Sequence, residues 1–148
     1  MKAMYRIIAL LILSWSLIAC GPQKVGSDED ANAMAEKFVR AVHTANYDEA
    51  FSLVSDEFYA PRPRDKWIAY YKAIDEVMGP VVSVKLVRKH EDDRFSGRFY
   101  VYEFSIKHEN GFTKDMITFV QKINTEAPLQ VLAHKIDSSK LAKVNSMY

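Results

Sequence analysis

The sequence predicts an α+β protein in which three helices precede a four-stranded antiparallel sheet. Apolar residues recur at helical spacing from Ala31 to about Met78, and Gly79 and Pro80 then end that pattern. After Pro80, apolar and polar residues alternate, which is typical of strands with one buried face. The connections between these alternating segments are short and polar, so neighbouring strands should pair as hairpins. Because the helices are the only available cover, we expect them to pack on one face of a curved sheet.

The first predicted helix begins near Ala31 and ends near Asn46. Ser27, with Asp30 three residues later, resembles a capping sequence that starts a helix. The apolar positions that follow are spaced by three or four residues, as on one helix face. They are Ala31, Met34, Ala35, Phe38, Val39 and Val42. Asn46 can cap a short second helix, which we expect over residues 47–54.

The third predicted helix runs from about Arg64 to Met78. Pro61 and Pro63 prevent regular helix before it, and Gly79 ends it. Its apolar positions again form a single stripe. They are Trp67, Ile68, Tyr71, Ile74 and Met78.

Four strands are expected near residues 82–86, 100–106, 112–123 and 129–136. In the first strand, Val82, Val84 and Leu86 share a face that we expect to be buried. Asn110 and Gly111 favour a tight hairpin between the second and third strands. The segment after the last strand is polar, and we expect it to be loose.

The first twenty residues have the layout of a secretory signal peptide. Lys2 and Arg6 supply a positive start, and residues 7–18 are largely apolar. The alternative is a permanent transmembrane helix, but an apolar run of about 12 residues is shorter than the ~20 that span a bilayer. No basic cluster follows the run, so the signal peptide is the favoured interpretation.

The residues Leu17, Ile18, Ala19 and Cys20 resemble a bacterial lipobox, and Cys20 is the only cysteine of the chain. The resemblance implies cleavage before Cys20, a diacylglyceryl group on its sulfur and acylation of its amino group. Several acyl chains hold a protein on a membrane stably, whereas one chain binds only marginally. In such lipoproteins, Asp directly after the cysteine retains the protein at the inner membrane, whereas Gly21 stands here. We therefore expect an outer-membrane anchor facing the periplasm, the alternative being an unmodified thiol beside an ordinary cleavage site.

Length and composition limit the remaining possibilities. The chain of 148 residues has room for one domain. We expect a signal peptide at 1–19, a flexible tether at 20–30, the domain at 31–137 and a polar tail at 138–148. The 20 Lys and Arg residues nearly balance 19 Asp and Glu residues, so no basic footprint for nucleic acid exists. One cysteine and four widely spaced histidines indicate no metal site, and we expect no cofactor.

The order of helices and strands resembles the cystatin-like cone of the nuclear transport factor 2-like superfamily. Within it, the chain most resembles secreted bacterial proteins with domain of unknown function 4019. Three segments carry the resemblance, namely AEKFVRAVHTANYDEAFSLVSDEF, RDKWIAYYKAIDEVMGPVVSVKLV and RFYVYEFSIKHENGFTKDMITFVQK. The last strand, LQVLAHKID, departs from it because it lacks the Trp-x-Val that such strands often carry. The resemblance implies a cone with a cavity at its open end and says little about activity.

Aromatic side chains are the best candidates for a binding site. They are numerous where the third helix should meet the sheet, and they could line a pocket for a small apolar ligand or an envelope protein. The alternative is that they form an ordinary core. The candidate pocket residues are Trp67, Tyr71, Tyr102, Phe104 and His134.

We expect a non-enzymatic binding domain that membrane lipid holds in the envelope through acylated Cys20. The alternative is a small hydrolase or isomerase in which His134 acts as a general base with a nearby carboxylate. A carboxylate within hydrogen-bond reach of His134 in a cavity would favour that alternative. A third possibility is a structural accessory that dimerises through an apolar sheet face including Phe99 and Val101. The chain has no nucleophile motif or phosphate-binding loop, so no catalytic residue is predicted.

Overall fold

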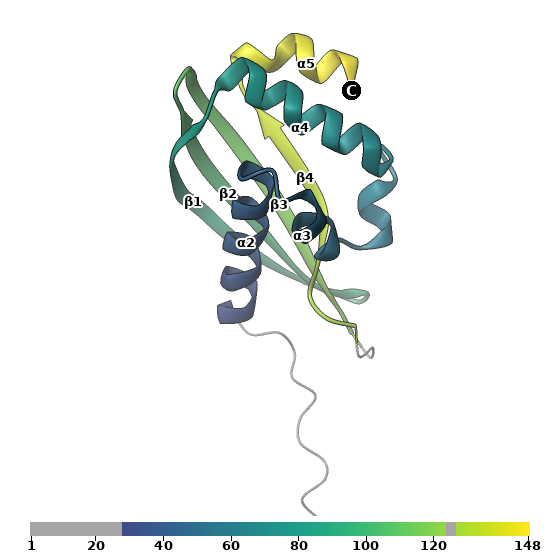
Figure 1. Ribbon diagram of the computed structural model, residues 1–148. Coiled ribbons are helices and arrows are strands. Elements are labelled where there is room, and N and C mark those ends of the chain that lie inside the picture. Colours follow the sequence, from purple (N-terminus) through teal and green to yellow (C-terminus); the bar gives the residue numbers. More distant parts are fainter. Residues whose placement is uncertain (1–27, 124–126) are drawn as a thin grey trace, which may run out of the picture.

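The structure of this protein is a computed structural model that describes residues 28–123 and 127–148 (Figure 1). The predicted signal peptide, the lipobox and most of the tether lie outside the described residues. Within them, helices come first and a four-stranded antiparallel sheet follows, as the sequence predicts. None of the described helices has the length and apolar character needed to cross a bilayer.

The helical half of the domain contains four elements. They are α2 (Asp28–His43), α3 (Tyr47–Ser52), the 3₁₀ helix η2 (Asp56–Tyr59) and α4 (Arg64–Met78). Acidic residues occupy the first turn of α2, where they complement the helix dipole. The side chain of Asn46 caps α3 by accepting a hydrogen bond from the backbone N–H of Glu49. Gly79 ends α4 with a φ of 72°, a conformation that glycine adopts without strain.

The sheet is a meander in which each strand pairs with the next along the chain. The strands are β1 (Val81–Arg94), β2 (Gly97–His108), β3 (Gly111–Lys122) and β4 (Gln130–Asp137). β1 and β2 are longer than predicted, because the polar residues before the first hairpin continue β1 up to a two-residue turn. Arg98 stabilises this extension by donating to its cross-strand partner Asp93 over 2.6 Å.

The core lies between the helices and the inner face of the sheet. In Figure 1, α2, α3 and α4 all cover the same face of the sheet. The largest fully buried side chains include aromatic residues from both layers. Among them are Phe38, Tyr71, Tyr100, Tyr102 and Phe119. The middle strands therefore have a buried face, as their alternating sequence predicts.

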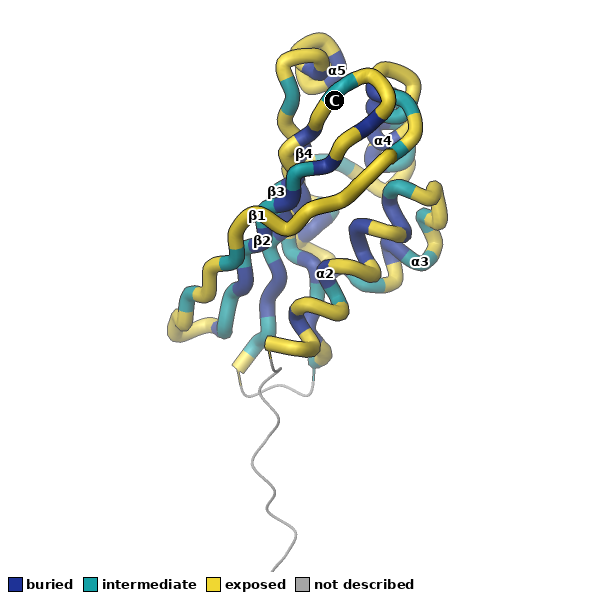
Figure 2. The backbone as a smooth tube through the Cα atoms, turned by 90° about the vertical axis from the view of Figure 1, so that its left-hand side faces the viewer, coloured by how far each residue is buried: buried dark blue, intermediate teal, exposed yellow. Residues whose placement is uncertain are grey.

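Strand β1 departs from the predicted burial. Val82, Val84 and Leu86 have exposed fractions of 56%, 47% and 44%, although their spacing predicts a buried face. Figure 2 shows β1 exposed along most of its length, whereas β2 alternates between buried and less buried residues. The physical reason is that β1 is an edge strand and extends beyond the cover that the helices provide.

The expectation of a loose C-terminal segment is wrong. The 3₁₀ helix η3 (Ser139–Leu141) and the helix α5 (Ala142–Met147) follow β4 and lie beside α4 (Figure 1). Leu141 and Val144 are buried, and Tyr70 Oη donates to Asn145 Oδ1 over 2.9 Å. Two apolar side chains in a polar segment are enough to dock this last turn on α4.

Candidate functional site

A buried carboxylate joins three elements in the centre of the domain. Asp115 occupies an inward position of β3, and its side chain has no exposed surface. Its Oδ1 accepts a hydrogen bond from Thr113 Oγ1 over 2.8 Å. Its Oδ2 lies 3.3 Å from Nε2 of His43 on α2 and 3.2 Å from Nε2 of His134 on β4. Because an ionised carboxylate only accepts hydrogen bonds, both imidazoles donate through Nε2–H.

These hydrogen-bond partners keep the carboxyl group of Asp115 ionised. Burial acts to raise the pKa of this carboxyl. The hydrogen bonds that His134 and His43 donate outweigh burial and hold the pKa below its ordinary value of 3.8. Asp115 is therefore ionised at neutral pH.

Tyr71 extends the cluster on the side of His134. Its Oη lies 2.9 Å from His134 Nδ1. Because His134 donates through Nε2 to Asp115, its Nδ1 accepts the hydroxyl proton of Tyr71. Burial, and then the charge of Asp115, raises the pKa of Tyr71 well above its ordinary value, so this proton stays on the tyrosine.

His108 extends the cluster on the side of Thr113. Its Nδ1 lies 3.0 Å from the carbonyl oxygen of Gly79, which can only accept, and its Nε2 lies 3.2 Å from Thr113 Oγ1. Thr113 has one hydroxyl proton, which it donates to Asp115. His108 therefore connects Thr113, and through it Asp115, to the backbone at the end of α4.

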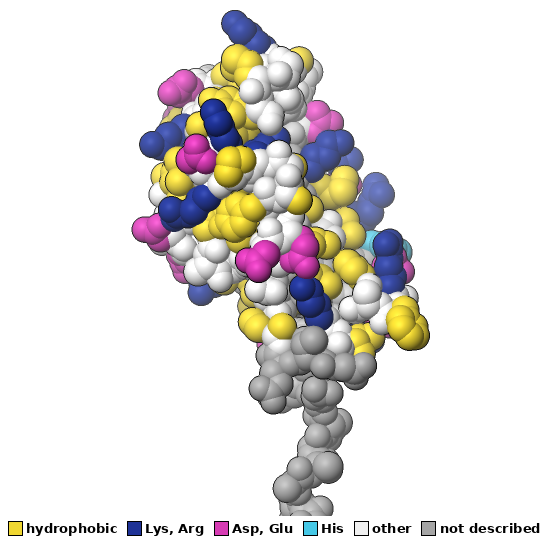
Figure 3. Space-filling view, turned by 90° about the vertical axis from the view of Figure 1, so that its right-hand side faces the viewer, with side chains coloured by type: hydrophobic (Ala, Val, Ile, Leu, Met, Phe, Trp, Pro, Cys, Tyr) yellow, Lys and Arg dark blue, Asp and Glu magenta, His cyan; other side chains and the backbone are white. Residues whose placement is uncertain are grey.

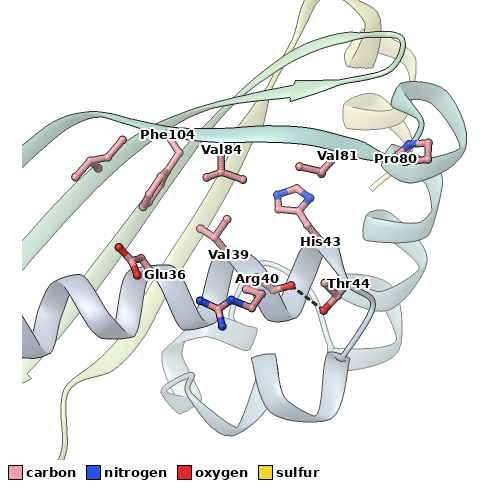
Figure 4. A pocket seen from close by; sticks show the side chains of 10 residues that line it. Glu36, Val39, Arg40, His43, Thr44, Pro80, Val81, Val84 and Phe104 are labelled. Carbon is pink, nitrogen blue, oxygen red and sulfur yellow. Dashed lines mark hydrogen bonds between the residues drawn. The ribbon is translucent and has the colours of Figure 1, made fainter.

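A pocket of about 580 Å³ lies between α2 and β1, next to this cluster (Figure 4). Most of its lining is apolar, and a few polar side chains of α2 complete it. The lining residues are Glu36, Val39, Arg40, His43, Thr44, Pro80, Val81, Val84, Leu86 and Phe104. This pocket explains why β1 is exposed. The side of β1 that faces α2 forms a wall of the open pocket and does not pack in the core.

His43 connects the pocket to the buried cluster. Its side chain is only 6% exposed, and in Figure 4 its ring lies between α2 and β1 beside Val81. The Nε2 atom is bonded to Asp115, whereas Nδ1 has no hydrogen-bond partner among the described residues. Of the cluster residues in the described part of the chain, His43 alone lines the pocket.

The pocket differs from the one expected from the sequence. Of the five candidate residues, only Phe104 lines it. Trp67, Tyr71, Tyr102 and His134 are buried away from it. The rings of Trp67 and Phe58, for example, stack with their centroids 4.6 Å apart. These aromatic residues therefore form an ordinary core, which was the alternative to a ligand pocket.

The expected carboxylate partner of His134 is present, but it is not accessible. The side chains of His134 and Asp115 both have an exposed fraction of 0%, so neither faces the pocket. Asp115 and His43 are not among the site residues that the sequence predicts. The sequence signal that could have identified Asp115 is its position on β3. It alternates with Thr113 and Ile117 on the buried face of that strand.

Two further features bear on what this domain can bind. No group of three or more His, Cys, Asp or Glu side chains in residues 28–123 and 127–148 is arranged to hold a metal ion. Phe99 and Val101, on the outer face of the sheet, are half-buried, and the large exposed apolar side chains of the described chain lie mainly on β1 and at the hairpins. Phe99 also lines a hollow with Val120, Ile123 and Leu132, so a dimer through the sheet stays a prediction.

Three solved structures share this architecture. An NTF2-like protein of unknown function from Pseudomonas putida KT2440 matches with a TM-score of 0.52 and 11% identity, over 75% of this chain and 85% of that one. An NTF2-like protein from Cytophaga hutchinsonii matches with a TM-score of 0.52 and 11% identity, over 76% and 99%. Bd1075 of Bdellovibrio bacteriovorus matches with a TM-score of 0.52 and 9% identity, and the match spans 75% of this chain but only 41% of that protein.

These matches show that the chain has the NTF2-like fold, the cone predicted from its sequence. No protein-family model and no curated protein matches the chain. The finer resemblance to domain of unknown function 4019 therefore stays a prediction.

Proposed function

We propose that this protein is an envelope lipoprotein whose NTF2-like domain binds a small, largely apolar ligand between α2 and β1. The pocket is the observation that carries the proposal. Its volume of about 580 Å³ falls in the range typical of small-molecule sites, which are mostly apolar with a few polar groups. Val39, Val84 and Phe104 would contact the apolar body of the ligand, and Arg40 and Thr44 would contact a polar end.

The anchor is the second part of the proposal. The lipobox ending at Cys20 supports acylation, and Gly21 supports sorting to the outer membrane. Membrane lipid would then be the permanent partner of the protein. Figure 3 shows basic and acidic side chains interspersed over the face that it presents, which gives no support to nucleic acid as a partner.

The ligand is tested by native mass spectrometry of the protein gently released from its own membrane. We expect wild type to carry an additional small molecule that Val84→Asp loses. Val82→Asp is the matched control, because it places the same charge on β1 at an exposed position that does not line the pocket. A bound molecule retained by Val84→Asp, or none in wild type, would refute this pocket as the binding site.

The anchor is tested by intact mass and membrane fractionation of wild type and Cys20→Ser. We expect wild type to carry the acyl mass and to appear in the outer-membrane fraction. The variant should lack the acyl mass and be absent from that fraction. A free thiol in a soluble wild-type protein would refute the anchor.

A small hydrolase or isomerase is the second candidate, and the position of His43 favours it. A general base must reach the proton it removes, and His43 Nδ1 is the free nitrogen of a ring that lines the pocket. Asp115 would orient this ring and stabilise its protonated form, which is the usual role of the third group in such arrangements. His134 cannot take the part that its sequence context suggested, because its side chain is fully buried.

We place binding first because most of the polar cluster is sealed from the pocket. Hydrolysis of p-nitrophenyl butyrate, an ester small enough for the pocket, distinguishes the two candidates. If the protein is a hydrolase, His43→Gln should lower kcat/KM by about 10²-fold. His90→Gln is the control, because His90 is exposed on β1. Equal turnover by wild type and His43→Gln would remove this candidate.

A further inference from the structure

The β1–β2 hairpin ends in a fully exposed phenylalanine. Phe95 has a relative exposure of 106%, the highest of the large apolar side chains in the described chain. It stands in the two-residue turn between Arg94 and Gly97, which pair with each other. Single exposed apolar residues are common on protein surfaces, so this side chain matters only together with its position.

The hairpin lies at the end of the domain where the described chain begins. Lys89 of β1 forms an ion pair of 3.0 Å with Asp28, the first residue of α2. Figures 1 and 2 show the start of α2 and the β1–β2 hairpin at the same end of the molecule in both views. Lys122 pairs with Gly97 beside the turn, so Ile123, which is 48% exposed, also lies at this end.

The segment between the proposed lipidation site and α2 is short. Cys20 is eight residues before Asp28, so an acyl group on Cys20 lies within at most about 29 Å of the start of α2. The six residues from Lys89 to Phe95 extend β1 by roughly 20 Å past the ion pair with Asp28. The hairpin turn is therefore within reach of any bilayer that holds Cys20.

The charges beside Phe95 are already paired. Arg94 Nε donates to Asp92 over 2.7 Å, and Arg98 donates to Asp93. These pairs leave no surplus positive charge on the hairpin to attract anionic lipid. A membrane contact made here would depend on its apolar side chains and would respond little to salt.

We propose that the end of the domain formed by Phe95 and Ile123 is a membrane-contact site, at which both side chains enter the interfacial region of the anchoring bilayer. This inference rests on the lipid anchor proposed above. The contact orients the domain with its sheet standing on the membrane. The β2–β3 hairpin, with the 60% exposed Phe112, is then held away from the bilayer by about 40 Å, the length of the 12 residues of β2.

The test uses the acylated protein, from Cys20 onward, in vesicles of phosphatidylethanolamine and phosphatidylglycerol. Phe95→Cys and Phe112→Cys each introduce one free thiol, because Cys20 is consumed by the anchor, and each is labelled with an environment-sensitive fluorophore. Both positions are exposed phenylalanines at hairpins, so the two variants are matched. Lipids carrying a nitroxide should quench the label at position 95 at least about two-fold more than the label at position 112, in low and high salt alike.

The outcomes separate the contact from the anchor. Equal quenching at both positions in a protein whose intact mass shows acylation would overturn the contact and leave the anchor standing. A chain without acyl mass that washes off the vesicles would overturn the anchor, and the contact with it. Preferential quenching that disappears in high salt would also contradict the inference, because it would indicate electrostatic rather than apolar attachment.

Discussion

Replacement of Asp115 by Asn tests whether the buried polar cluster stabilises the domain. The amide keeps the shape of the carboxylate but removes its charge and one of its two acceptor oxygens. Asp115 accepts from Thr113, His43 and His134, and hydrogen bonds to a charged group contribute about 1.5–3 kcal/mol each. The new NH₂ group cannot accept, so the donors that face it lose their partner. Loss of one or two of these hydrogen bonds should lower the free energy of unfolding of Asp115→Asn by about 3 to 4 kcal/mol.

The loss should depend on pH in a defined direction. The folded-state pKa of Asp115 lies below the ordinary value of 3.8, because the hydrogen bonds of His134 and His43 outweigh the effect of burial. A carboxyl group with a lowered folded-state pKa stabilises the fold above its unfolded-state pKa, and this contribution is lost as the pH falls further. The difference between wild type and Asp115→Asn should be complete at neutral pH and shrink below pH 3.8.

Urea unfolding followed by the fluorescence of Trp67 measures both effects, because Trp67 is buried against Phe58. Asp137→Asn is the control, since Asp137 is an exposed acid at the end of β4. A loss below about 1 kcal/mol in Asp115→Asn, similar to that of an ordinary surface change, would refute the reasoning. So would a difference from wild type that persists unchanged at low pH.

Three smaller predictions follow from the packing and the surface. Phe38→Ala should lower the free energy of unfolding by about 3–5 kcal/mol in the same urea assay, because this side chain is 0% exposed. Gly97→Ala should destabilise the first hairpin by about 1–3 kcal/mol, because the added Cβ would lie 2.6 Å from the carbonyl oxygen of Gln121; no loss of thermal stability would contradict this. The hydrogen bond from Lys122 lowers the pKa of Glu57 to about 2, so an NMR titration of Lys122→Gln should find that pKa higher, while stability changes by less than about 1 kcal/mol because the pair is exposed.

Much of the fold could be predicted from the sequence. The predicted third helix, from about Arg64 to Met78, matches α4, because Pro63 and Gly79 are local signals that act within a few residues. Alternation predicted the inward faces of β2 and β3 for the same reason. The docking of α5 was missed, because two buried side chains in a polar segment leave no periodic pattern.

The candidate site was less predictable. The sequence predicted His134 as a pocket residue, but its side chain is fully buried, among residues far along the chain. The pocket wall on β1 was expected to be core, because an edge strand that extends beyond its helical cover has the same alternation as a covered one. The aromatic residues were expected to line a cavity, and only Phe104 does so.

The sequence by itself determined the element order, the strand pairing and most of the core, because helical spacing, alternation and turn residues act over short distances. It also carries the lipobox ending at Cys20, a local motif on which the proposed anchor rests. Only the tertiary structure decided that His43 and His134 share one oxygen of Asp115, since these contacts join residues 72 and 19 positions apart. Which polar side chains meet in a core depends on the register of the strands and on how α2 lies across them, and no local pattern encodes either.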